Sequence, residues 1–294
     1  MVSYTFDMEI RRLTPRSKDY PKVLGQIVGV PKQLFCAGVA LDELLKRPRV
    51  AIVGSRNVSP YGKQVTLQLG RQLAEQGIVI ISGLALGVDG FAHQATLDAN
   101  GLTIAVLPGP LEAIAPSTHY HLAQTILDKG GTLVSEYRAG EFAAKQNFIA
   151  RNRLVAGLAQ AVLITEAAEK SGSLHTARFA LEQGKDVLAV PGNITSPVSV
   201  GTNNLIKAGA IPVTSYLDVL HVLGLSEHAT VAHEVRGRNA NEQTVLNLLL
   251  QGVQDGESLL RQSELTTSEF NQVLTMLEIG GKVRSLGANQ WSLR

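Results

Sequence analysis

The sequence predicts an α/β protein in which a doubly wound, mostly parallel sheet precedes a small winged-helix-like domain. Two observations predict this fold class. Between residues 49 and 224, short apolar runs alternate with stretches of helical period, whereas residues 241–294 read as three short helices and a hairpin. Alternating strands and helices are typical of a parallel sheet that is covered by helices on both faces.

Seven apolar runs are the predicted strands of the sheet. They are rich in β-branched residues and apolar on both faces, as strands buried beneath two helical layers are. A helix is predicted over residues 59–77, because Ser59 is a suitable N-cap, Pro60 suits the first turn, and apolar residues recur at helical spacing after them. The strands are RVAIVGS, IVIISG, TIAVLPG, GTLVSEY, AVLITEA, DVLAVPG and AIPVTS (49–55, 78–83, 103–109, 131–137, 161–167, 186–192 and 210–215).

The chain is predicted to have four parts. Residues 1–48, with 8 Lys/Arg against 5 Asp/Glu, are expected to form a helical lead-in to the sheet domain at 49–224. A polar, aperiodic linker at 225–240 and the winged-helix-like domain at 241–294 follow.

Composition excludes several classes of protein. The formal net charge is only +2, so a site for a polyanion must be a local patch. The single cysteine, Cys36, allows no disulfide framework and fits a reducing, cytoplasmic setting. We find no signal peptide and no apolar run as long as a membrane span, so no membrane association is expected.

Small-residue turns follow four of the predicted strands, at the edge of the sheet where ligands bind. Gly54-Ser55-Arg56 follows the first, and an arginine fork beside exposed backbone N–H groups suits phosphate. Ser171-Gly172-Ser173 precedes a predicted helix, whose N-terminus favours anions. Gly201-Thr202-Asn203 is expected to act in the same way. Two plainer interpretations stay open: an ordinary surface turn at the first site and simple N-capping by Ser173.

Positive charge is concentrated in residues 145–153. Lys145, Arg151 and Arg153 lie there, and no acidic residue occurs between Lys145 and Ala161. Together with the N–H-rich turns, these cations predict a groove for a chain of phosphates.

Other kinds of site are disfavoured. The sequence has neither G-x-G-x-x-G nor G-x-x-x-x-G-K-[ST], so neither a dinucleotide nor ATP is expected, and we predict no cofactor. Asp89 and His93 are four residues apart and could form an acid–base pair, although helix capping by Asp89 and loop orientation by His93 is the favoured interpretation. His119 and His121 lack an obvious third ligand, so no metal site is expected.

Several motifs, in order and spacing, resemble the DNA-processing protein A (DprA/Smf) family. The resemblance runs from about Tyr20 to the C-terminus and includes VAIVGSR, ISGLALGVDGFAH, VSEY, EKSGSLHTARFALEQG and the tail LTMLEIGGKVRSLG. It implies an extended Rossmann-type sheet and a cytoplasmic homodimer. It also implies a non-enzymatic mediator that binds and protects incoming single-stranded DNA and loads the RecA recombinase during natural transformation in competent cells.

The resemblance also implies which residues hold the DNA backbone. They come from the GSR turn, from a Lys-x-x-Phe pair and from the RNR motif, which are here Ser55, Arg56, Lys145, Phe148 and Arg151-Asn152-Arg153. Two alternatives stay open. Phe148 either stacks on a base or belongs to the core, and one of the two arginines either contacts DNA or braces the groove against Glu136 or Glu166.

Two other functions compete with DNA binding by the sheet domain. One is hydrolysis of a nucleotide N-glycosidic bond, as in a nucleoside monophosphate phosphoribohydrolase. Leu205 stands where that reaction would need a glutamate, which disfavours an enzyme. The other is duplex recognition by the winged helix, which its 4 Lys/Arg against 6 Asp/Glu disfavour.

Overall fold

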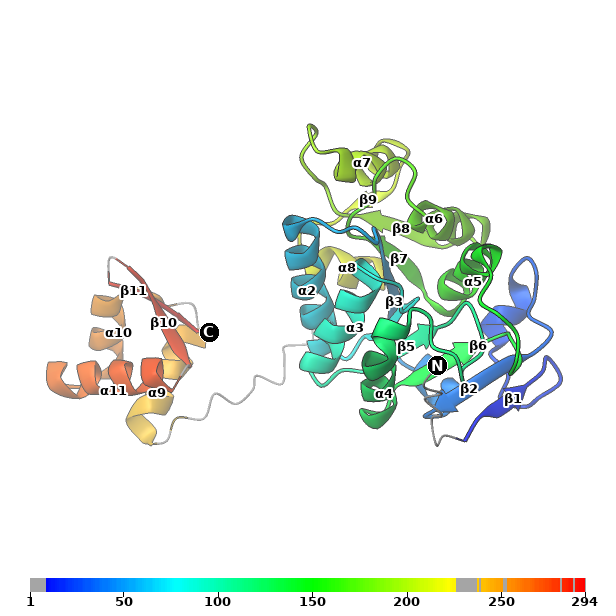
Figure 1. Ribbon diagram of the computed structural model, residues 1–294. Helices are drawn as coiled ribbons and strands as arrows, with labels where there is room; N and C mark the ends of the chain where they lie inside the picture. Colours follow the sequence, from blue (N-terminus) through cyan, green and yellow to red (C-terminus); the bar gives the residue numbers. More distant parts are fainter. Residues whose placement is uncertain are drawn as a thin grey trace. The chain divides into compact units, whose positions relative to one another are not determined.

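The computed structural model describes residues 9–225, 237, 239–250, 253–280, 282–287 and 289–293. The chain divides into two compact units, Met1–Glu227 and His228–Arg294 (Figure 1). Most of the predicted linker at 225–240 lies outside the described residues.

A nine-stranded sheet forms the centre of the first unit. Its strand order is β1-β2-β6-β5-β4-β3-β7-β8-β9, and every pair from β6 to β9 is parallel. The strands are β1 Arg11–Leu13, β2 Leu34–Gly38, β3 Arg49–Val53, β4 Val79–Ser82, β5 Thr103–Val106, β6 Thr132–Ser135, β7 Ala161–Ile164, β8 Asp186–Ala189 and β9 Ile211–Pro212.

The order of the strands reverses at β3. The chain runs outward from β3 through β4 and β5 to β6, and then returns to add β7 on the other side of β3. Val50 pairs with Ile80 of β4 and with Ala161 of β7, so the three strands are in register and their carboxyl ends meet at one edge. The predicted doubly wound, mostly parallel sheet is therefore confirmed. In such a sheet the switch point between β3 and β7 is where a ligand crevice forms.

Helices cover both faces of this sheet (Figure 1). Alternate residues of β3 enter two separate cores. Ala51 and Val53 pack in a cluster with Leu154 of α5 (Lys145–Leu158), whereas Val50 and Ile52 pack with Leu69 of α2 (Pro60–Glu75). This alternation follows from the two-residue period of a strand. The longer helices are α2 Pro60–Glu75, α3 Val88–Asp98, α4 Tyr120–Asp128, α5 Lys145–Leu158, α6 Ser173–Glu182, α7 Val200–Lys207 and α8 Tyr216–Val222.

The predicted helix at 59–77 is confirmed in its start and its end. The Ser59 hydroxyl accepts the Gly62 N–H at 3.1 Å, and Pro60 is the first helical residue. Gly77, just beyond the helix, has a φ of 75°, a value that glycine adopts without strain.

The expectation of a helical lead-in at 1–48 is wrong for the residues that the structure describes. Strands β1 and β2 extend the sheet, with β2 pairing antiparallel to β6, while the helical elements η1 (Lys22–Gln26) and α1 (Leu41–Leu45) are short. Leu34 and Cys36 are buried because β2 lies against the sheet edge. This pairing joins segments about a hundred residues apart, so no local pattern in the sequence could reveal it.

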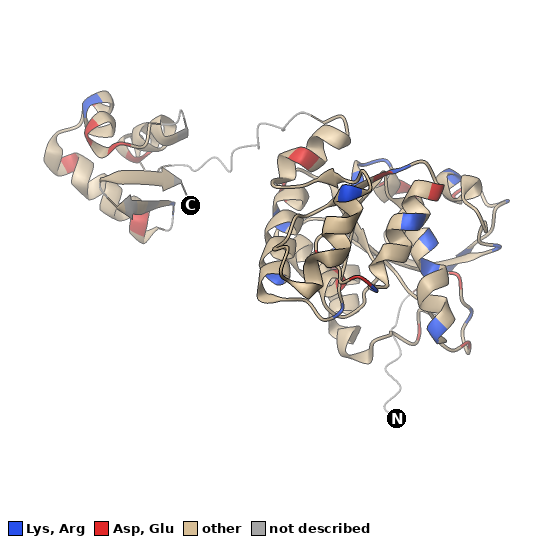
Figure 2. Ribbon diagram, turned by 90° about the horizontal axis from the view of Figure 1, so that it is seen from above, with Lys and Arg blue, Asp and Glu red and all other residues tan. Residues whose placement is uncertain are grey.

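The second unit contains three helices and a hairpin among its described residues. They are α9 Ala240–Leu250, α10 Gly256–Ser263, α11 Thr267–Ile279, β10 Val283–Gly287 and β11 Gln290–Leu293. A capping box starts α11, since Thr266 and Glu269 exchange hydrogen bonds, and Phe270 and Leu277 fill the core. Acidic positions are visible on its helices in Figure 2.

Candidate nucleic-acid interface

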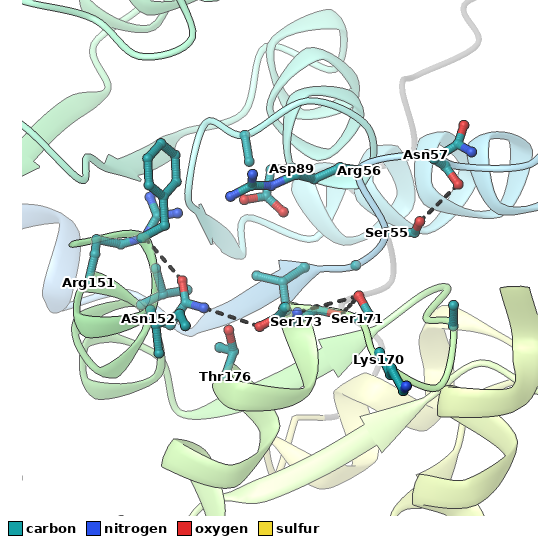
Figure 3. A pocket seen from close by; sticks show the side chains of 18 of the residues that line it. Ser55, Arg56, Asn57, Asp89, Arg151, Asn152, Lys170, Ser171, Ser173 and Thr176 are labelled. Carbon is teal, nitrogen blue, oxygen red and sulfur yellow. Dashed lines mark hydrogen bonds between the residues drawn. The ribbon is translucent and has the colours of Figure 1, made fainter. Parts of the chain in front are cut away.

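A pocket of about 610 Å³ opens at the switch point, where β3 and β7 end (Figure 3). This switch-point pocket is formed by the loop after β3, the start and middle of α5, and the loop that leads into α6. Ten of the fourteen predicted site residues line it: Gly54, Ser55, Arg56, Lys145, Phe148, Arg151, Asn152, Ser171, Gly172 and Ser173.

Hydrogen bonds made by Ser55 hold the loop after β3 in place. Ser55 donates its N–H to the Glu166 carbonyl at 2.8 Å and its hydroxyl to the Asn57 carbonyl at 2.8 Å. Gly54 has no room for a side chain, because a Cβ would lie 2.7 Å from the Glu166 carbonyl oxygen. The tight turn leaves Arg56 exposed at the pocket.

Phe148 is neither fully buried nor isolated. It is partly exposed in the pocket, and the Arg56 guanidinium lies 4.8 Å from the centre of its ring. This cation–π contact joins the loop after β3 to α5. The alternative in which Phe148 is a core residue is therefore not supported, whereas stacking on a base remains a proposal.

Arg151 lies at the bottom of the pocket and is only 3% exposed. It donates to the carbonyl of Gly83 at 2.6 Å and also to the carbonyl of Val106. Burial lowers the pKa of Arg151 to about 10, which still leaves the guanidinium charged at neutral pH. A side chain at Gly83 would displace this guanidinium, since a Cβ there would come within 2.6 Å of three of its atoms. The arginine thus ties α5 to the ends of β4 and β5.

Asp89 is the acidic residue that lines this pocket. It is buried in the first turn of α3 and accepts the Gly83 N–H at 3.0 Å. Burial raises the pKa of the Asp89 carboxyl, and the nearby charge of Arg151 opposes that rise. His93 does not line the pocket; it is fully buried and bonds Thr103 at 2.7 Å. Both residues therefore have structural roles, but not the ones favoured from the sequence. The N-cap of α3 is Gly87, with no side-chain cap hydrogen bond, so Asp89 holds the loop after β4 and does not cap the helix, and His93 bonds a strand residue and not a loop.

Arg153 points away from the switch-point pocket. Its guanidinium forms a two-point ion pair with Glu136, with Nη2 2.6 Å from Oε2 and Nη1 3.2 Å from Oε1. It also donates to the carbonyl of Gly29 at 2.9 Å. The alternative in which one arginine braces the structure against Glu136 is confirmed for Arg153.

The start of α6 forms the opposite wall. Gly172 is its N-cap, and Ser173 is its first residue, so simple N-capping by the Ser173 side chain does not occur. Instead the hydroxyls of Ser171 and Ser173 bond each other at 2.8 Å, and Asn152 donates to the Gly172 carbonyl at 3.3 Å. A Cβ on Gly172 would meet no atom within 4 Å, so this corner is open.

Nine pocket residues were absent from the predicted site, among them the polar residues Asn57, Lys170 and Thr176. Lys170 directly precedes Ser171, so its place next to the predicted helix-start nest was the signal that could have identified it.

Gly201, Thr202 and Asn203 do not line the switch-point pocket. The Gly201 N–H donates to the Ala167 carbonyl at 2.7 Å, and Thr202 is buried. Asn203 bonds both the N–H and the carbonyl of Gly192, each at 3.1 Å. The prediction that these three residues form an anion nest at this pocket is therefore not supported, because their polar groups are bonded within the protein or buried at the start of α7.

The pocket is strongly cationic. Four cationic side chains and one carboxylate line it, a net charge of +3 with all of them ionised. Arg56, Lys145 and Lys170 are exposed and take part in none of the ion pairs between described residues. No group of His, Cys, Asp and Glu in the described part of the chain could hold a metal ion. Such a site suits an extended anion more than a small neutral molecule.

Comparison with known proteins identifies the family. The model of DNA recombination-mediator protein A matches residues 11–224, and that of the DprA winged helix domain matches residues 232–289. The chain belongs to the DNA recombination-mediator protein A family.

Curated relatives support this membership. Protein Smf of Escherichia coli is 44% identical over 212 residues, which are 72% of this chain and 56% of that protein. DNA processing protein DprA of Bacillus subtilis is 41% identical over 207 residues, which are 70% of this chain and 69% of that protein. The match to the first of these thus spans only a little over half of its length.

Solved structures of the family share the fold. DNA processing protein A of Streptococcus pneumoniae aligns with a TM-score of 0.68 and 40% identity, over 72% of this chain and 74% of that one. The protein from Helicobacter pylori aligns with a TM-score of 0.66 and 35% identity, over 74% and 97% respectively. That structure was described for its single-stranded DNA binding mode.

Proposed function

We propose that this member of the family binds the backbone of single-stranded DNA in the switch-point pocket. One observation carries the proposal. Three exposed cations, Arg56, Lys145 and Lys170, line the same pocket as the N-terminus of α6 and the partly exposed aromatic ring of Phe148. Phosphate suits the three charges and the positive end of the α6 dipole, and a base can stack on Phe148.

We further propose that the protein acts as a recombination mediator. It protects incoming single-stranded DNA in the cytoplasm and loads the RecA recombinase during natural transformation, and it works as a homodimer. Membership of the family supports this role. Among the residues described, none of the helices combines the length and the apolar character that crossing a membrane requires.

Hydrolysis of a nucleotide is the weaker alternative. The carboxylate in the switch-point pocket is Asp89, and it is buried and bonded to the Gly83 N–H. Leu205 occupies the position at which the related hydrolases would need a glutamate. No second function is therefore proposed.

The test compares one labelled thymidine oligonucleotide with a blunt duplex of the same length by fluorescence anisotropy. Single-stranded DNA should bind far more tightly, and its affinity should fall with salt with a slope of about −0.7 per phosphate contact. Equal affinity for the duplex would contradict the proposal.

Variants then locate the site. Arg56→Ala, Lys145→Ala and Lys170→Ala should each weaken binding by about 1–3 kcal/mol, because each removes a charge-assisted contact. Lys207→Ala is the matched control, since Lys207 is an exposed cation on α7 that does not line the pocket. If all three pocket variants bind as the control does, the pocket is not the DNA site.

The mediator role has a separate test. On single-stranded DNA coated with single-strand binding protein, the wild type should speed filament formation by RecA, and Arg56→Ala should not. Equal stimulation by both proteins would separate RecA loading from the pocket. Light scattering at micromolar concentration tests the homodimer.

A further inference from the structure

A second pocket, of about 470 Å³, lies beside the start of α2 and the loop after β8. Its lining includes Ser59, Tyr61, Pro191, Gly192, Asn193 and Ser199, and no charged side chain is among the residues that form it. A phosphate would find no cation there. The pocket instead offers an aromatic ring, a proline, and amide and hydroxyl groups, which are the groups that contact a nucleobase.

Tyr61 is held in a fixed position in this second pocket. Its hydroxyl donates to the Pro191 carbonyl at 2.8 Å, while 48% of the residue stays exposed. The hydrogen bond fixes the ring between α2 and the loop after β8. An exposed ring that is already ordered can stack on a base with little further loss of conformational freedom.

The loop after β8 is also held in place where it lines this pocket. Gly192 is clamped by two hydrogen bonds with the Asn203 side chain, each 3.1 Å long. A Cβ on Gly192 would come within 2.2 Å of the Ser199 hydroxyl, so the chain passes there without room for a side chain. Asn203, which does not reach the switch-point pocket, thus shapes the second one.

The two pockets are neighbours. Asn57 lines the switch-point pocket and Ser59 lines the second, so their α-carbons are at most about 7.6 Å apart along the chain. Both pockets lie at the carboxyl ends of strands in one sheet, after β3 and β7 for the first and after β8 for the second. The linings of the two pockets therefore meet at this turn, and an extended strand can pass from one pocket to the other.

We propose that the second pocket holds one base of a DNA strand whose phosphates lie in the switch-point pocket. The inference rests on the proposed function and adds the direction in which the strand leaves the site, across the turn from Asn57 to Ser59. The charged pocket takes the backbone, and the uncharged pocket with Tyr61 takes a base.

The test uses the full chain and a labelled thymidine oligonucleotide in an anisotropy titration. Tyr61→Leu should weaken binding about five- to hundredfold, the range expected for loss of one stacked base. Its salt slope should match the wild type, because no phosphate contact is lost. Tyr61→Phe, which keeps the ring, should bind within about threefold of wild type. Arg56→Ala should instead lower both the affinity and the salt slope.

Photocrosslinking supplies a direct readout with the wild-type protein. Thymine is replaced by 5-iodouracil at one position of the oligonucleotide at a time, and crosslinked peptides are identified by mass spectrometry. A crosslink to Tyr61 from one or two adjacent positions supports the proposal. No crosslink to Tyr61 from any position overturns it, even if Tyr61→Leu fails to fold.

The outcomes also separate this inference from the function on which it rests. If Arg56→Ala binds weakly while Tyr61→Leu binds as wild type does, the second pocket holds no base and the proposed function stands. If Tyr61→Leu and all three pocket variants, Arg56→Ala, Lys145→Ala and Lys170→Ala, bind as wild type does, the proposed function fails and the inference fails with it.

Discussion

Arg151→Leu tests whether the buried arginine at the bottom of the pocket braces the structure or contacts DNA. The change removes the hydrogen bonds to the carbonyls of Gly83 and Val106. It also leaves Asp89 buried without the positive charge that opposes its pKa rise. Removing one partner of such a buried arrangement costs about 3–5 kcal/mol.

Thermal melting followed by circular dichroism measures this cost. In a domain of this size, 1 kcal/mol lowers the Tm by about 2–4 °C, so Arg151→Leu should lower it by roughly 6–20 °C. Arg178→Leu is the matched control. Arg178 lies exposed on α6 beside Glu182 at 3.3 Å, and loss of a surface pair of this kind costs at most about 1 kcal/mol.

A second substitution distinguishes the cause of the loss. Asp89→Asn in the Arg151→Leu background removes the uncompensated carboxylate and should recover part of the lost stability. If Arg151→Leu melts within about 2 °C of the wild type but no longer binds single-stranded DNA, Arg151 contacts the ligand and the bracing role is refuted.

Three further predictions concern the first unit. Burial lowers the pKa of His93 to about 3, below the usual 6.5, so the free energy of unfolding should fall as pH drops from 6.5 to 3, by up to about 1.4 kcal/mol per pH unit. Urea titrations should show a steeper slope in the wild type than in His93→Gln, which keeps only the contribution of the carboxylates; equal slopes would contradict it. Gly87→Ala should cost about 1–3 kcal/mol and weaken DNA binding, since Gly87 has a φ of 79° and a Cβ would lie 2.3 Å from the Ser55 carbonyl oxygen. Residues 1–238 alone should bind single-stranded DNA within about threefold of the full chain, roughly 0.7 kcal/mol, by anisotropy. A hundredfold loss from a truncated protein that melts cooperatively would assign DNA binding elsewhere.

The central sheet could be predicted because its strands are local apolar runs and its helices have local caps. Ser59, for example, identifies the start of α2 without reference to any distant residue. The rule that parallel strands share a carboxyl edge then brings the turns after β3 and β7 together. Gly54 and Ser171 are more than a hundred residues apart in the sequence, yet both line the switch-point pocket.

The individual roles of the cations could not be predicted in this way. Arg151 and Arg153 belong to one short motif, but a separation of two residues on a helix turns their side chains to nearly opposite sides. One enters the sheet edge and bonds Gly83, while the other meets Glu136. The sequence allowed either Glu136 or Glu166 as partner, and only the fold decides between them.

The same limit applies to glycine-rich turns. Ser171-Gly172-Ser173 and Gly201-Thr202-Asn203 look alike as possible anion nests, but a free N–H depends on what packs against it. The N–H groups of Gly201 and Ser171 are bonded to the carbonyls of Ala167 and Ala168, and that of Ser173 to the Ser171 hydroxyl, whereas Gly172 has open space beside it. A motif of small residues therefore predicts a tight turn more securely than it predicts a ligand.

The division of the cations would allow a chain with a net charge of only +2 to bind the proposed polyanion. Arg151 donates to the Gly83 carbonyl, and Arg153 is bonded to the Gly29 carbonyl and to Glu136. These two arginines therefore stabilise the pocket structure, and their charges are already compensated within the protein. Of the four cations that line the pocket, Arg56, Lys145 and Lys170 stay exposed, so these three can exchange bound counterions for phosphates. The salt dependence of binding should therefore report on the exposed set alone. A measured slope that falls with Arg56→Ala but not with a stably folded Arg153→Leu variant would follow from this division, and the reverse pattern would contradict it.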